Sequence, residues 1–124
     1  MATTDVKEFM KYDLLENDTI EYKGRTLYRI QSRKNFADVK VGDLGGYIEK
    51  IGNLSNVMNC WVYDNAKVYG GGRVQHDAQV RDDAEVFGRA LVHDNAEVYG
   101  GACIYGDARV RGWASVSDNA KVFG

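Results

Sequence analysis

The chain has 124 residues, which is enough for one domain with a single core. Charged residues make up 27% of it, with both signs interspersed and a formal net charge of −2, so it lacks the basic surface of a general nucleic-acid-binding protein. No apolar run reaches the roughly 18 to 20 residues of a membrane span. The N-terminus lacks the basic and then apolar layout of a secretory signal, so we expect a cytoplasmic protein that contacts neither membranes nor nucleic acid.

The first 53 residues are rich in strand-forming side chains and predict a small β segment. Thr3 or Thr4 is a candidate cap for one helical turn that runs through Met10. Lys23-Gly24 is a candidate hairpin turn, because both positions tolerate the backbone angles of a tight turn. Short strands are expected in three segments: Lys11–Leu15, Thr19–Tyr22 and Arg25–Gln31.

Gly42 and the pair Gly45-Gly46 are expected to break the chain before Tyr47 and Ile48 lead into the remaining sequence. We interpret residues 1–53 as an N-terminal cap. A cap is needed because an array of stacked strands exposes unpaired edges and apolar side chains at its ends. A cap that also binds a partner is the alternative interpretation.

From Cys60 onward, a small residue is followed two positions later by Val or Ile, and this pattern recurs every six residues. A period of six does not follow the 3.6 residues per turn of a helix, so it predicts a parallel β-helix of short strands and corners. The large positions are Val62, Val68, Val74, Val80, Val86, Val92, Val98, Ile104, Val110, Val116 and Val122. We therefore predict an all-β chain with about 3.6 coils in residues 54–124 and a cap in residues 1–53.

Three such hexads make one coil, so residues 18 apart are expected to lie above one another at about 4.8 Å. The outward residue after each Val then falls into one of three columns. The first column is aromatic, and a glycine follows each member: Tyr69, Phe87, Tyr105 and Phe123. The second holds Tyr63, Arg81, Tyr99 and Ser117, and the third holds Gln75, His93 and Arg111.

The aromatic column is either a stacking ladder or a contact surface. Val122, Phe123 and Gly124 are expected to leave the last coil uncapped, which favours self-association there. We therefore choose as candidate partner-binding or oligomerisation residues the four aromatics of the first column together with two tyrosines of the second: Tyr69, Phe87, Tyr105, Phe123, Tyr63 and Tyr99.

Catalytic chemistry has little support in the sequence. His76 and His93 are the two histidines, and neither has an orienting carboxylate at an obvious local spacing, although acidic residues adjoin both. No metal-ligand spacing or phosphate-binding glycine loop is present, so we expect no catalytic residue, no metal and no cofactor. Cys60 is expected to point inward and Cys103 outward, which argues against a disulfide.

Two stretches carry a family resemblance: residues 35–48, NFADVKVGDLGGYI, and residues 60–66, CWVYDNA. They resemble the elements DFxDVKxGxxGGW and CWVYDxA of bacterial and prophage-borne hexapeptide-repeat proteins, with Asn35 and Tyr47 in place of the commoner acid and Trp. The resemblance implies that the coils are left-handed, against the usual hand of parallel connections. Members are sometimes labelled transferases from their fold alone, and no catalytic residue carries over.

The favoured hypothesis is a non-catalytic binding protein, and a dimer is the favoured oligomer. The family context implies a phage-type protein that binds and blocks a host macromolecule, including a component of antiviral defence such as a CRISPR effector. One alternative is an acyltransferase that uses acyl-CoA, for which a histidine would be the general base. The other is a structural component of a phage.

Overall fold

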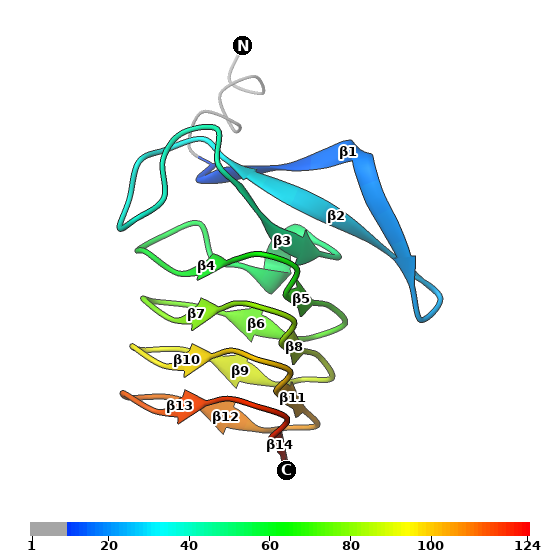
Figure 1. Ribbon diagram of the computed structural model, residues 1–124, viewed down its shortest axis with the longest axis vertical. Helices are drawn as coiled ribbons and strands as arrows, with labels where there is room; N and C mark the ends of the chain where they lie inside the picture. The colour runs from blue at the N-terminus through cyan, green and yellow to red at the C-terminus, as the bar shows by residue number, and fades with distance from the viewer. Residues whose placement is uncertain (1–9) are drawn as a thin grey trace.

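The computed structural model describes residues 10–124, which form a parallel β-helix with a β-hairpin across its N-terminal end (Figure 1). The predicted all-β architecture and the stacking of hexapeptide coils are confirmed. The predicted helical turn that starts at Thr3 or Thr4 lies outside the described residues, apart from Met10. No helix within residues 10–124 has the length and hydropathy that crossing a bilayer requires.

The hairpin consists of β1 (Tyr12–Tyr22) and β2 (Arg25–Ser32), which pair in antiparallel register. Its turn is at Lys23-Gly24, as predicted, where both residues have positive φ values of 53° and 78°. The two strands predicted on either side of residue 17 are one continuous strand. An irregularity in the pairing between Leu15 and Thr19 bends it, and such bulges change the direction of a strand without ending it.

Strand β3 (Leu44–Ile48) joins the hairpin to the β-helix, because it pairs antiparallel with β2 and parallel with β5 (Lys67–Val68). The prediction that Gly45-Gly46 breaks the chain is wrong, since both residues lie inside this strand. Their role is close approach to the first coil. A Cβ atom on Gly46 would lie 2.5 Å from the carbonyl oxygen of Ala66, and one on Gly45 would lie 2.6 Å from that of Val62.

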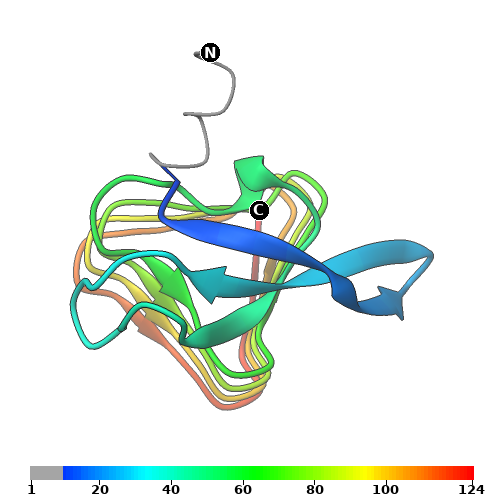
Figure 2. The ribbon, with the colours of Figure 1, turned by 90° about the horizontal axis from the view of Figure 1, so that it is seen from above.

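The coils stack into three faces. Seen along the axis, they superpose as a triangle, and the hairpin crosses it (Figure 2). After the 3-10 turn η3 (Ile51–Asn53), the strands are β4 (Trp61–Val62), β5 (Lys67–Val68), β6 (Arg73–Val74), β7 (Gln79–Val80), β8 (Glu85–Val86), β9 (Leu91–Val92), β10 (Glu97–Val98), β11 (Cys103–Tyr105), β12 (Arg109–Val110), β13 (Ser115–Val116) and β14 (Lys121–Phe123). Their sheets run β1-β2-β3-β5-β8-β11-β14, β13-β10-β7-β4 and β12-β9-β6.

The repeat positions fill the interior, as the six-residue period predicts. Every large position from Val62 to Ile104 has no exposed surface, and each pairs with the residue one coil away, as Val62 does with Val80. Burial ends with the last coil, where Val116 and Val122 are half-exposed and Ala114 and Ala120 are exposed. Burial of the repeat positions is therefore complete next to the cap and partial in the last described coil.

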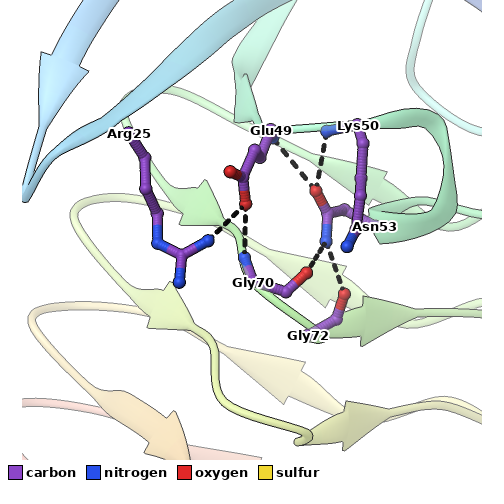
Figure 3. Close-up of polar contacts among 6 residues, drawn as sticks. All are labelled: Arg25, Glu49, Lys50, Asn53, Gly70 and Gly72. Carbon is purple, nitrogen blue, oxygen red and sulfur yellow. Dashed lines mark hydrogen bonds and ion pairs between the residues drawn. The ribbon is translucent and has the colours of Figure 1, made fainter.

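The amide side chain of Asn53 links the cap to the first coil through hydrogen bonds (Figure 3). Asn53 is fully buried, and its Oδ1 accepts hydrogen bonds from the backbone N–H groups of Glu49 at 3.0 Å and Lys50 at 2.9 Å. Its Nδ2 donates to the carbonyls of Gly70 at 3.1 Å and Gly72 at 2.8 Å. One side chain thus binds four backbone groups of the 3-10 turn and the first corner, and it shares the Glu49 N–H with the carbonyl of Val68 at 3.2 Å.

The close approach of β3 to the first coil gives a stability prediction. Gly46→Ala is expected to lower the free energy of unfolding by about 1–3 kcal/mol, because the added methyl group meets the backbone of Ala66, which cannot rotate away. Chemical denaturation followed by circular dichroism measures the change. Gly52→Ala is the matched control, since a Cβ atom there meets nothing within 4 Å. Equal stability of the two variants would contradict the prediction.

Candidate interaction surface

The four aromatic residues of the first column form the stacked ladder that their spacing predicts. Ring centroids lie 5.1 Å apart between Tyr69 and Phe87, and 5.2 Å apart for each of the next two pairs. The planes are nearly parallel, at angles of 1°, 7° and 17° going from the first pair to the last. Such offset stacking stabilises adjacent strands beyond the area that it buries.

The ladder is not uniformly displayed. Tyr69 is only 4% exposed, Phe87 and Tyr105 are half-buried, and Phe123 is 65% exposed. The expectation that Tyr69 is a surface residue is therefore wrong. The hairpin folds down over this side of the coils (Figure 1), and Leu27 of β2 packs with Tyr69 in a small second core. Tyr69 is thus a packing residue, and the open part of the ladder is its C-terminal end.

Glu85 fastens the tip of the hairpin to the ladder. Its Oε1 accepts a hydrogen bond from the Tyr69 hydroxyl at 2.7 Å, and its Oε2 accepts one from the Tyr22 hydroxyl. Burial and then the neighbouring Glu85 carboxylate raise the pKa of Tyr22 to about 12, and the same causes raise the pKa of Tyr69 further. Lys23 adds an ion pair at 3.9 Å from Glu85 Oε1.

Tyr63 and Tyr99, the other two candidates, lie away from the ladder. They follow β4 and β10 on the four-stranded sheet, whereas the ladder lies on the seven-stranded one. The Tyr63 hydroxyl donates to Asp38 Oδ1 at 2.8 Å and ties the loop before β3 to the first coil. Tyr99 lies under the guanidinium of Arg81 at 5.3 Å. Both are half-buried and already have intramolecular partners.

Among the described residues after Met58, the large apolar side chains that are exposed both lie on the last coil. Trp113, at the corner between β12 and β13, is 82% exposed, and Phe123 ends β14. Strands β12, β13 and β14 are the final members of their sheets within residues 10–124, so each has one unpaired edge in the described part of the chain. Two large apolar side chains are therefore exposed on the last described coil.

Trp113 is not among the contact residues predicted from the sequence. Its position distinguishes it, because the residues one, two and three coils earlier in the same corner column are polar: Asn95, Asp77 and Asn59. These residues and Trp113 line a groove of about 250 Å³. A tryptophan in a column of turn-forming polar residues is not explained by corner chemistry.

The two histidines come together at the same corner as Trp113, since His76 and Asp94 directly precede Asp77 and Asn95. His76 Nδ1 and His93 Nδ1 each lie 3.2 Å from Oδ1 of Asp94. No orienting carboxylate is expected at an obvious local spacing, and the carboxylate that contacts both rings is Asp94, which adjoins His93 and lies 18 residues from His76, one coil away. The expected lack of a disulfide is confirmed, since Cys60 is buried, Cys103 is half-buried and both are free.

Comparison of the sequence with protein-family models finds no match, and comparison with curated proteins finds no relative. Two structural features of the chain bear on its function. They are the exposed side chains of Trp113 and Phe123 and the cluster of His76, His93 and Asp94.

The hydroxyls bound to Glu85 give an alkaline stability prediction. Raised pKa values mean that the folded chain holds these phenolic protons more tightly than the unfolded chain, in which tyrosine titrates near pH 10. The stabilisation of the fold by the protonated Tyr22 hydroxyl is therefore complete below about pH 10, and it is lost as the pH rises through about 12.

Denaturation at several values between pH 8 and 12 is expected to show a falling free energy of unfolding, and Tyr22→Phe is expected to make that fall less steep. Phenolate absorbance checks the titration directly. Folded protein in which every tyrosine ionises near pH 10 would contradict the assignment.

Proposed function

We propose that this protein is a non-catalytic binding protein that contacts other proteins through the surface that carries Trp113 and Phe123. The observation that carries the proposal is the exposure of these two large aromatic side chains, 82% and 65%. Aromatic side chains anchor protein interfaces because they bury a large area when a partner covers them.

A rigid frame supports this role. The backbone of the last coil is held to the preceding one by regular hydrogen bonds, such as those from Tyr99 N to the Val116 carbonyl at 2.9 Å and from Cys103 N to the Ala120 carbonyl at 2.9 Å. A surface that is already ordered loses little conformational entropy when a partner docks, and this favours affinity.

The first partner that we propose is a second copy of the chain, because it carries the same exposed apolar side chains and can contact them symmetrically. We propose a homo-oligomer, most simply a dimer. The resemblance to prophage-borne hexapeptide-repeat proteins supports a second partner, a macromolecule of the bacterial cytoplasm that the protein binds and blocks, such as a component of antiviral defence.

Removal of the two exposed aromatics tests the proposal. Trp113→Ser combined with Phe123→Ser is expected to weaken self-association or partner capture at least tenfold, about 1.4 kcal/mol, because the variant loses the anchors of the contact. Light scattering after gel filtration measures the mass, and affinity capture from a bacterial lysate measures partner binding. Circular dichroism should be unchanged, since neither side chain is in the core.

The matched control is Val57→Ser, which removes an apolar side chain that is also 65% exposed but precedes the first coil. Wild-type association in this control and loss in the double variant are the expected results. A wild-type protein that is monomeric and captures nothing would overturn the proposal, as would association that survives the double substitution. Tyr69 is not a suitable test position, because it is buried beneath the hairpin.

A further inference from the structure

We propose that His76, His93 and Asp94 form a binding site for a divalent transition-metal ion, with Zn²⁺ as its simplest occupant. One ligand atom from each of the three residues lies within 4.8 Å of the other two. The site shares its corner with Trp113, because Asp94 accepts a hydrogen bond from the backbone N–H of Gly112, the residue before Trp113. Its test reads ion binding and not association, so the two proposals can fail separately.

The fold places the three side chains together. Strands β6 and β9 pair with Val74 opposite Val92, so residues 76 and 94 occupy the same corner of successive coils. Both have a φ of 60°, and the hydrogen bond from Asp77 N to the Asp94 carbonyl at 2.9 Å holds the two corners together. His93 directly precedes Asp94 in the chain, so its ring reaches the same carboxylate. The backbone of the site is therefore fixed before any ion binds.

The distances match those between ligands of one ion. Zn²⁺ binds imidazole nitrogen at about 2.0–2.1 Å and carboxylate oxygen at about 2.0–2.2 Å, so neighbouring ligand atoms around it lie roughly 3.0–3.4 Å apart. Asp94 Oδ1 already lies 3.2 Å from Nδ1 of each histidine. The two imidazole nitrogens lie within 4.8 Å of each other, and the half-exposed ring of His76 would turn toward His93 when an ion binds.

A second contact orients the carboxylate. Asp94 Oδ2 accepts a hydrogen bond from the backbone N–H of Gly112 at 3.0 Å, which leaves Oδ1 directed at the histidines. Contacts of this kind orient metal ligands in proteins. The backbone N–H of Asp94 also donates to His76 Nδ1 at 3.2 Å. Binding through Nδ1 would release this N–H to water at a half-exposed corner.

The hydrogen bonds that stabilise the corners of the β-helix explain only part of this cluster. At the equivalent corner of another face, Asp64 Oδ2 accepts from Asp82 N at 3.2 Å, and Asp82 Oδ2 accepts from Gly100 N at 2.9 Å. His76 fills the same acceptor role through Nδ1. A turn acceptor does not require a second histidine on the same carboxylate, however, and both histidines of the chain are found here.

The ligand set indicates which ions to expect. Two imidazoles and one carboxylate favour Zn²⁺, Ni²⁺ or Cu²⁺ over Mg²⁺ and Ca²⁺, which prefer oxygen ligands. The partial exposure of all three side chains leaves room for water at the remaining coordination positions. Arg111 follows β12 one coil beyond His93, and its positive charge opposes the ion, so we expect micromolar rather than nanomolar affinity.

Calorimetric titration of ZnCl₂ into the full-length, untagged and chelator-treated protein tests the site. The expected result is one ion per chain, with affinity reduced at least tenfold in His93→Ala and in Asp94→Asn. MgCl₂ should give no saturable binding. Nitrogen-15 NMR of the imidazoles offers a direct readout, because the chain contains only these two histidines and each should shift on Zn²⁺ addition.

The matched control is Asp82→Asn, which alters a corner acceptor of the same kind with no histidine bound to it, and it should keep wild-type Zn²⁺ affinity. Circular dichroism of each variant verifies the fold. The absence of saturable Zn²⁺ binding below about 1 mM would overturn the proposal and leave Asp94 as a hydrogen-bond partner of the two rings. Affinity that is unchanged in both His93→Ala and Asp94→Asn would overturn it as well.

Discussion

The backbone ladder between successive coils is the constraint on which the rest of this structure depends. Each coil donates to the carbonyls of the next at the same register, as Lys67 N does to Ala84 and Glu85 N does to Ala102, both at 2.9 Å. This register places like positions directly above one another, so an aliphatic side chain always meets an aliphatic one inside. The outer columns inherit the same order, which is why the aromatic rings stack and why His76 meets Asp94.

The cap and the last described coil differ in how their side chains and backbone groups are covered. At the cap, β3 continues the sheet, and Lys11, itself buried, donates through Nζ to the carbonyls of Cys60 at 2.7 Å and Met58 at 3.1 Å. Burial lowers the pKa of this lysine, while the carbonyl contacts compensate its lost hydration. On the last described coil, Trp113 and Phe123 are exposed.

Much of the fold was predictable because the repeat is local: the six-residue period identified the inward positions, and Lys23-Gly24 identified the hairpin turn. The sequence could not show that the hairpin folds back to cover Tyr69, because that contact depends on long-range packing with no periodic signal. Gly45-Gly46 looked like a break because close backbone approach and chain reversal both select glycine. The pairing of His76 with Asp94 was hidden by a separation of 18 residues. The left hand of the coils and the contact role of the aromatics stay predictions.

The in-register stacking also defines how such a protein can change in length. Because every coil repeats the same 18-residue spacing, as in the pairing of Val80 with Val98 and then with Val116, one coil could be duplicated or deleted without turning any face. The cap and the terminal surface would move apart or together by one strand spacing, about 4.8 Å. Evolution could in this way adjust the distance between the two ends in fixed steps and leave the chemistry of each end untouched.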